Sequence, residues 1–139
     1  MGKINYGRVV FGGLIAGLVL NAGELLLNTQ LIAKDWEEAM RAINKPPIGN
    51  ETAAIFVALM FVLGIIAVYV YAAIRPRFGP GPKTAICAGL TVWALAYAWP
   101  ALSGIPMDVF PARLFIISMA WGFFEVPIAT LAGGWIYRE

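Results

Sequence analysis

Residues 17–29 read GLVLNAGELLLNT, and this stretch lies inside an apolar segment that runs from Arg8 to Ile32. An α-helix needs about 20 such residues to cross a bilayer core of about 30 Å, so the segment is long enough to span. Glu24, Asn21 and Asn28 interrupt it, although ionisable and amide side chains are rare at membrane depth. The stretch therefore predicts a membrane helix that carries one carboxyl group flanked by two amides.

The whole chain has the composition of a membrane protein. Of its 139 residues, 60% are hydrophobic and 13% are charged, whereas soluble domains carry roughly 25% charge. Three further apolar segments match the first in length, and they cover residues 52–74, 83–102 and 113–137. We therefore expect an all-α integral membrane protein in which residues 1–139 form a single four-helix transmembrane bundle.

The basic residues of the flanks and loops are distributed unevenly between the two expected sides. One side collects six basic residues and one acidic residue: Lys3, Arg8, Arg75, Arg77, Lys83, Arg138 and Glu139. The other side holds four basic and five acidic residues: Lys34, Arg41, Lys45, Arg113, Asp35, Glu37, Glu38, Glu51 and Asp108. Lysine and arginine in short loops favour the cytoplasmic side. We expect a multi-pass protein of the cell membrane, of the bacterial inner-membrane type, with both termini cytoplasmic.

The long loop after the first span predicts a short surface helix over about residues 34–44. Its apolar residues recur at helical spacing: Trp36, Ala39, Met40 and Ile43. Charged residues occupy the remaining face, as in amphipathic helices that lie in the membrane interface. Two interpretations stay open, an interfacial anchor and a lid over a cavity between the spans.

Several kinds of site are disfavoured by composition. The chain has no histidine, which is the commonest zinc and haem ligand, and a single cysteine, Cys87, so it cannot form an internal disulfide. A net charge of +2 gives no reason to expect nucleic-acid binding. We therefore predict neither a metal site nor a cofactor.

Two of the predicted spans repeat one design, a face of small residues that carries a glutamate. On the first span this face holds Gly13, Gly17, Asn21, Glu24 and Asn28. On the fourth it holds Ser118, Gly122, Glu125, Ala129 and Gly133. Small residues allow close helix approach, and an ionised carboxylate in lipid costs at least ~2.5 kcal/mol. We expect both glutamates to point into protein, with Asn21 or Asn28 hydrogen-bonded to a glutamate.

The two carboxyl groups are expected at different depths. Glu125 is twelve residues from Arg113 and Glu24 eight residues from Ile32, which is roughly 18 Å and 12 Å of helix. The polar groups should therefore form a ladder and not converge on one point. Pro127 frees the backbone carbonyl of the residue four before it, a further seat for a cation or a proton-bearing water.

These patterns give two sets of candidate residues. The ion- or proton-binding candidates are Glu24, Glu125, Asn21, Asn28, Ser118 and, through its carbonyl, Phe123. The helix-packing candidates are Gly13, Gly17, Gly122, Ala129 and Gly133.

Two short features resemble elements of known membrane families. Asn21-x-x-Glu24 resembles the N-x-x-E element of the membrane-associated eicosanoid and glutathione metabolism family, whose members are four-span trimers of similar length. A glutamate on the first of four spans is similar to the small multidrug resistance transporters. The chain lacks the arginines and the histidine that accompany the first element. Its long loop and its second glutamate depart from the second family, so we assign no family and carry over no glutathione chemistry.

Three functions are compatible with the sequence. The favoured one is an oligomeric transporter or channel whose intramembrane carboxyl groups bind or relay a proton or cation. The alternative is a membrane scaffold, an assembly subunit or a lipid-binding protein whose glutamates specify helix packing. A membrane enzyme acting on a lipophilic substrate is the least favoured, since no nucleophile lies beside a base. The expected partners are the lipid bilayer and either further copies of the chain or the subunits of a membrane complex.

Overall fold

A computed structural model describes residues 3–137, and the described residues form helices and no strands. The elements are α1 (Tyr6–Leu26), η1 (Leu27–Leu31), α2 (Ala33–Ala42), α3 (Asn50–Phe78), α4 (Pro82–Trp93), η2 (Ala94–Ala98), α5 (Trp99–Gly104), η3 (Ile105–Met107) and α6 (Ala112–Ile136). The segments η1 and η2 are π-helical turns, and η3 is a 3₁₀ turn. Arg138 and Glu139, which count in the predicted charge asymmetry, lie outside the described residues.

Four continuous helical runs are long and apolar enough to cross a membrane: Tyr6–Leu31, Asn50–Phe78, Pro82–Met107 and Ala112–Ile136. The predicted all-helical chain with four potential spans is thereby confirmed. Most of the helices extend beyond the predicted apolar segments, because hydropathy marks the apolar part of a helix and not its polar ends. The last turns of α3 continue through Pro76 and hold Arg75 and Arg77, which the sequence had placed in a loop.

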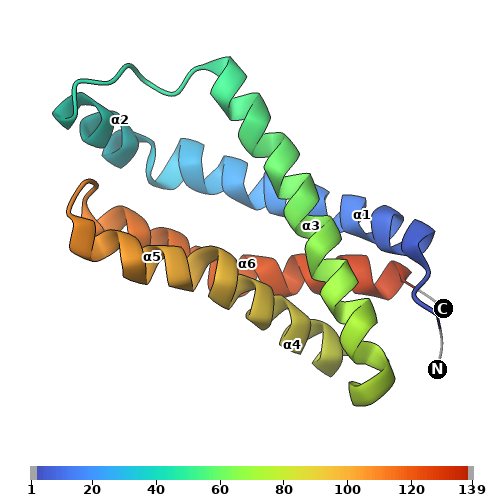
Figure 1. The fold of residues 1–139 in the computed structure, drawn as a ribbon. Helices are drawn as coiled ribbons and strands as arrows, with labels where there is room; N and C mark the ends of the chain where they lie inside the picture. The colour runs from blue at the N-terminus through green and yellow to red at the C-terminus, as the bar shows by residue number, and fades with distance from the viewer. Residues whose placement is uncertain (1–2, 138–139) are drawn as a thin grey trace.

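The helices form a bundle in which α1 and α6 lie side by side, α4 and α5 run along α6, and α3 crosses obliquely (Figure 1). The first and last described residues lie at one end, which we call the terminal end. There the backbone N–H of Asn5 donates to the hydroxyl of Tyr137 at 3.2 Å. The opposite end, the α2 end, holds α2 and the turn between η3 and α6.

The main core lies where α1, α3 and α6 pack together through very small residues. A β-carbon added at Gly12 would lie 2.6 Å from the carbonyl oxygen of Gly133, and one added at Gly64 would lie 2.5 Å from the backbone nitrogen of Gly17. Backbones therefore touch directly, as small residues at helix contacts allow. The predicted packing glycines of α1, Gly13 and Gly17, face α3, whereas the contact with α6 uses Gly12.

A second, smaller core lies at the α2 end, and we call it the α2 core. Its buried members are Leu27, Ile32, Ala39 and Leu114, with Trp36, Phe110, Ile117 and Trp121 packed against them. The helix expected over residues 34–44 is observed as Ala33–Ala42. It ends where Asn44 takes a left-handed conformation with φ 54°. This core places α2 over the ends of α1 and α6.

Candidate functional site

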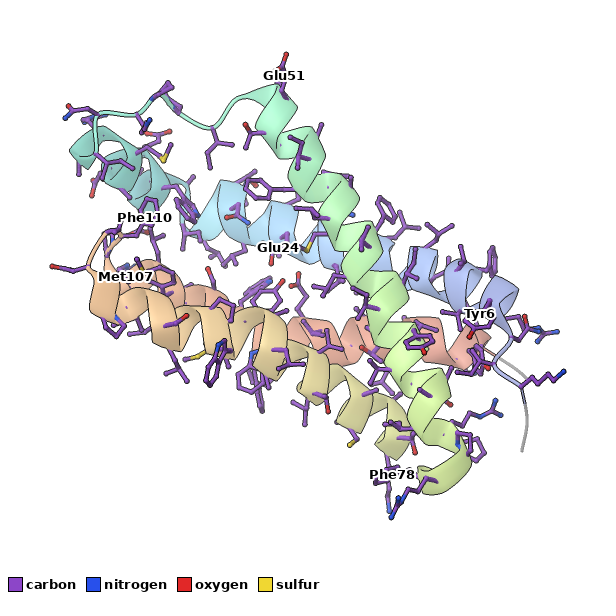
Figure 2. All side chains as sticks on the ribbon, viewed as in Figure 1. Tyr6, Glu24, Glu51, Phe78, Met107 and Phe110 are labelled. Atoms are coloured by element: carbon purple, nitrogen blue, oxygen red, sulfur yellow. The ribbon has the colours of Figure 1, made fainter. Side chains whose placement is uncertain are left out.

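The centre of the candidate site is the hydroxyl group of Tyr97, which lies between the carboxyl groups of Glu24 and Glu125. It is 2.7 Å from Oε1 of Glu24 and 3.3 Å from Oε2 of Glu125. Glu125 is 6% exposed and Glu24 is half-buried; Figure 2 shows Glu24 on the side of α1 that faces α5 and α6. The predicted inward orientation of both glutamates is confirmed.

The expectation that the two carboxyl groups stay apart is wrong. Three helices, α1, η2 and α6, bring Glu24, Tyr97 and Glu125 to one point. The depth estimate placed each carboxyl at the level of its own α-carbon. It neglected the length of the glutamate side chains, and it left out the third span, whose tyrosine closes the remaining distance.

Each of the four carboxyl oxygens has a hydrogen-bond partner. Besides the Tyr97 hydroxyl, Nδ2 of Asn28 donates to Oε2 of Glu24 at 2.8 Å, and Nε1 of Trp121 donates to Oε1 of Glu125 at 3.3 Å. The predicted bond between a glutamate and Asn21 or Asn28 is confirmed for Asn28. All these donors are neutral groups: a phenol, an amide and an indole.

A second tryptophan extends the network to α2. Nε1 of Trp36 donates to Oδ1 of Asn28 at 3.1 Å, so the amide of Asn28 joins an indole on α2 to the carboxyl of Glu24. We call the six linked residues the carboxyl cluster: Trp36, Asn28, Glu24, Tyr97, Glu125 and Trp121. The cluster runs from the α2 end into the interior of the bundle.

Both irregular helical segments carry a member of the carboxyl cluster. Asn28 lies in η1 and Tyr97 in η2. The widening of η2 has a cause in the sequence, because Pro100 lacks an N–H and its ring clashes with the carbonyl four residues earlier. In η1 the side chain of Asn28 donates to the backbone carbonyl of Glu24 at 2.8 Å, a bond that competes with the regular helix. Single π-helical turns of this kind occur frequently at functional sites.

Two glycines make room for the cluster. A β-carbon at Gly23 would overlap the carboxyl group of Glu125, so glycine at this position lets that group keep its place beside α1. A β-carbon at Gly122 would lie 2.7 Å from the ring of Tyr97. The sequence had assigned Gly122 to helix packing, and in the structure it admits the tyrosine ring.

The other predicted site residues lie outside the cluster. Nδ2 of Asn21 donates to the carbonyl oxygens of Gly17 at 2.9 Å and Val57 at 3.3 Å, and so joins α1 to α3. Ser118 is half-buried on α6, and the hydrogen bonds described for residues 3–137 do not link it to either carboxyl. Its expected part in the polar ladder is therefore not observed.

Phe123 also points away from the cluster. Its ring is 42% exposed and packs edge-on against Trp93 at 5.1 Å. Two residues separate it from Glu125, which is about 200° around an α-helix, so the two side chains leave α6 on opposite faces. The backbone carbonyl of Phe123 as an ion ligand stays a prediction. The packing residues Ala129 and Gly133 are buried, as expected of helix contacts.

Sequence reasoning missed four residues of the site: Tyr97, Trp36, Trp121 and Gly23. For Trp121 a signal existed, because it precedes Glu125 by four residues and therefore lies on the same helical face. For Tyr97 the signal was its position three residues before Pro100. Trp36 had been interpreted as an interfacial anchor, and nothing in its neighbourhood along the chain points to Asn28.

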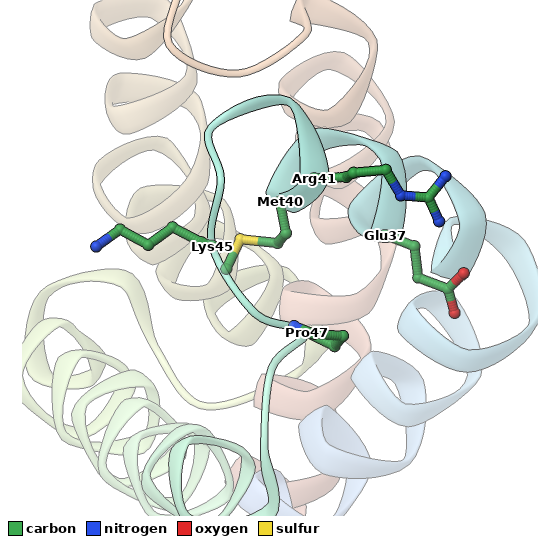
Figure 3. Close-up of a pocket in the computed structure, with 5 residues that line it drawn as sticks. All are labelled: Glu37, Met40, Arg41, Lys45 and Pro47. Atoms are coloured by element: carbon green, nitrogen blue, oxygen red, sulfur yellow. The ribbon is translucent and has the colours of Figure 1, made fainter.

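A hollow beside α2 does not include the carboxyl cluster. It is a shallow pocket of ≈ 250 Å³ between α2 and the loop that follows, lined by Glu37, Met40, Arg41, Lys45 and Pro47 (Figure 3). Among residues 3–137, no group of three or more histidine, cysteine, aspartate or glutamate residues is placed to hold a metal ion.

Comparison of the chain with protein-family models, with curated proteins and with solved structures found no match.

Proposed function

We propose that this chain is a small membrane transporter or channel that binds and relays protons, and that Glu24, Tyr97 and Glu125 hold the transferred proton. The observation that carries the proposal is the position of the Tyr97 hydroxyl, within hydrogen-bond distance of both carboxyl groups. Intramembrane glutamates are costly to bury and commonly mark proton or ion pathways.

The number of protons available to the Tyr97 hydroxyl supports the proposed proton relay. A tyrosine hydroxyl has one proton to donate, and the shorter contact, 2.7 Å, is to Glu24. The contact of 3.3 Å to Glu125 is then a hydrogen bond only when Glu125 carries a proton and donates it to the tyrosine oxygen. Two ionised carboxylates this close, with neutral donors around them, would repel each other strongly. Reversing both bonds moves the proton from one glutamate to the other.

A proton fits this site better than a metal cation does. The carboxyl oxygens accept from the N–H groups of Asn28 and Trp121 and from the O–H of Tyr97. These donors direct positively polarised hydrogens at the oxygens that would have to coordinate a metal ion. A cation would have to displace them, whereas a proton uses the same hydrogen bonds.

In this proposal the four long helices span a cell membrane, with cytoplasmic termini and with α2 at the outer interface, as the distribution of basic residues predicts. Every residue from 50 to 59 on α3 is exposed, including the apolar Ile55 and Phe56. Four helices enclose little space by themselves. A homo-oligomer, or a complex in which a partner covers this part of α3, is the assembly that we propose.

Proton movement can be measured in liposomes that contain the purified protein and an internal pH-sensitive dye. Under an imposed pH gradient and membrane potential, the wild type should acidify or alkalise the lumen faster than empty liposomes. Glu24→Gln and Glu125→Gln should abolish this flux, because each removes a titratable carboxyl while keeping its shape. The matched control is Glu51→Gln, an exposed glutamate at the start of α3. Equal flux in the wild type and both cluster variants would refute the proposal.

The scaffold hypothesis keeps one specific observation in its favour. The cluster is fully hydrogen-bonded and joins α1, η2 and α6, as glutamates that specify helix packing would do. If the glutamates only position helices, Glu125→Gln should preserve the assembly state, since an amide still bonds Tyr97 and Trp121. Native mass spectrometry of that variant, beside the flux measurement, separates the two functions.

A further inference from the structure

The α2 core contains the two indole donors of the carboxyl cluster. Trp36, on α2 itself, donates to Asn28, which in turn donates to Glu24. Trp121, on α6, packs against the same small core and donates to Glu125. Each glutamate therefore takes one of its hydrogen bonds from a group whose position depends on the docking of α2.

The contacts that hold α2 in place are few. Within the helix only Ala39 is buried. Trp36 packs edge-on against Phe110 with ring centroids 5.7 Å apart. Nε of Arg113, at the start of α6, lies 3.0 Å from Oδ1 of Asp35. The Arg113 side chain is 68% exposed and that of Asp35 27%, and ion pairs so open to solvent add little stability.

The chain on the C-terminal side of α2 is not buried against the bundle. Residues 44–50 are all exposed, and the first ten residues of α3 are exposed as well. Elements with little buried surface open at low free energy while the rest of a protein stays folded. By this measure α2 is held less firmly than α1, α3, α4 or α6, each of which buries a larger share of its residues.

We infer that α2 is a cover over the carboxyl pair, and that Trp36 and Trp121 are the positioning residues through which its docking controls access to Glu24 and Glu125. Docked, α2 keeps Asn28 on Glu24 and completes the core that holds the indole of Trp121. Lifted, it removes the Trp36 donor and admits water to Glu24, the half-buried member of the pair. The inference rests on the proposed function, since it assigns regulation to that same site.

A water-soluble carbodiimide tests the cover without any measurement of transport. The reagent modifies accessible carboxyl groups, and peptide mass spectrometry then gives the extent of modification at Glu24 and Glu125 in the purified protein. Arg113→Glu replaces the ion pair with Asp35 by a repulsion, and it should raise modification of Glu24 several-fold. The double variant Asp35→Arg with Arg113→Asp restores the pair in reverse and should return modification to the wild-type level. Arg41→Glu makes the same charge change on the exposed face of α2 and is the matched control.

Trp36→Phe gives a second, milder variant that keeps the ring in the α2 core and removes only its N–H donor. It should also raise modification of Glu24, with an unchanged melting temperature as evidence that the bundle stays folded. The inference is overturned if Arg113→Glu and Trp36→Phe are modified like the wild type, or if Arg41→Glu increases modification as much as Arg113→Glu does. If the glutamine variants lose proton flux but Arg113→Glu and Trp36→Phe are modified like the wild type, the proposed function is supported and the role of α2 as a cover is refuted. A responsive labelling pattern without any flux would do the reverse.

Discussion

The two ends of this bundle are held together in different ways. At the terminal end, regular helices touch backbone to backbone at Gly12, Gly64 and Gly133, and the surrounding core is apolar. Toward the α2 end, π-helical turns interrupt two of the helices, and a chain of hydrogen bonds through Glu24, Tyr97 and Glu125 joins them.

The two ends therefore have different properties: the terminal end holds the helices in fixed positions, and the carboxyl cluster contains hydrogen bonds that can rearrange. Contacts between glycine backbones contain no side chain that can rearrange. These contacts therefore fix how the helices cross at the terminal end. Hydrogen bonds between side chains can be exchanged, and π-helical turns are frequent at functional sites. We therefore expect substitutions at the terminal end to lower the stability of the fold. Substitutions in the carboxyl cluster should slow proton movement more than they lower stability.

The largest effect on stability is expected at the glycine contacts of the terminal end. Gly64→Leu places a bulky side chain where even a β-carbon would meet the backbone of α1, so α1 and α3 must separate. We expect loss of the folded protein, measured as yield of monodisperse material and as thermal unfolding in detergent. Gly49→Ala is the control, because nothing lies within 4 Å of a β-carbon there. A Gly64→Leu variant that melts like the wild type would contradict the role of these glycine contacts in holding the helices together.

Gly23→Ala tests the boundary between the two halves. Its methyl group would overlap the carboxyl of Glu125, which must swing away from Tyr97. Overpacking of one methyl group costs typically about 1–3 kcal/mol, so the bundle should still fold while most of the proton flux is lost. Unfolding and liposome flux are measured on the same preparation. Full flux in this variant would show that the contact between Tyr97 and Glu125 is dispensable.

Tyr97→Phe removes the hydroxyl and leaves the ring against Gly122. The carboxyl oxygens of Glu24 and Glu125 that contact this hydroxyl then lose their hydrogen-bond partner, and leaving a buried polar group unpaired costs about 1–3 kcal/mol. We expect a lower free energy of unfolding and a slower flux, because the proton must cross between the glutamates without the bridge. Tyr69→Phe, at an exposed tyrosine on α3, is the control. Equal flux in the two variants would contradict the bridging role.

The smallest effect is expected at Thr91. Its hydroxyl donates to the carbonyl of Cys87 on its own helix at 2.9 Å, and the residue is exposed. Surface substitutions of this kind stay within about 0.5 kcal/mol. Thr91→Ala should therefore leave both unfolding and flux unchanged. A clear loss of flux would mean that the hydroxyl of Thr91 belongs to the pathway.

Much of the fold could be predicted from the sequence, because the length of each apolar segment marks a helix long enough to span a membrane. The amphipathic pattern around Trp36 and Ala39 likewise placed α2 within two residues of its observed ends. The inward faces of Glu24 and Glu125 followed from the cost of a carboxylate in lipid.

The site was predicted less completely, because its decisive contact joins three helices. The contacts of Tyr97 to Glu24 and Glu125 span 73 and 28 residues of chain. A repeating pattern within one segment cannot indicate a contact between residues so far apart in the chain. Counting depth along straight helices also ignored the π-helical turns η1 and η2, which rotate Asn28 and Tyr97 relative to a regular helix.

The most direct test of the account is infrared spectroscopy of the purified protein at neutral pH. If Glu24, Tyr97 and Glu125 share a proton, the spectrum contains the carbonyl stretch of a protonated carboxylic acid, sensitive to exchange into D₂O. The band should persist in Glu51→Gln, change position in Tyr97→Phe and disappear in Glu125→Gln. Absence of the band from the wild type, or an unchanged band in Glu125→Gln, would contradict the shared proton.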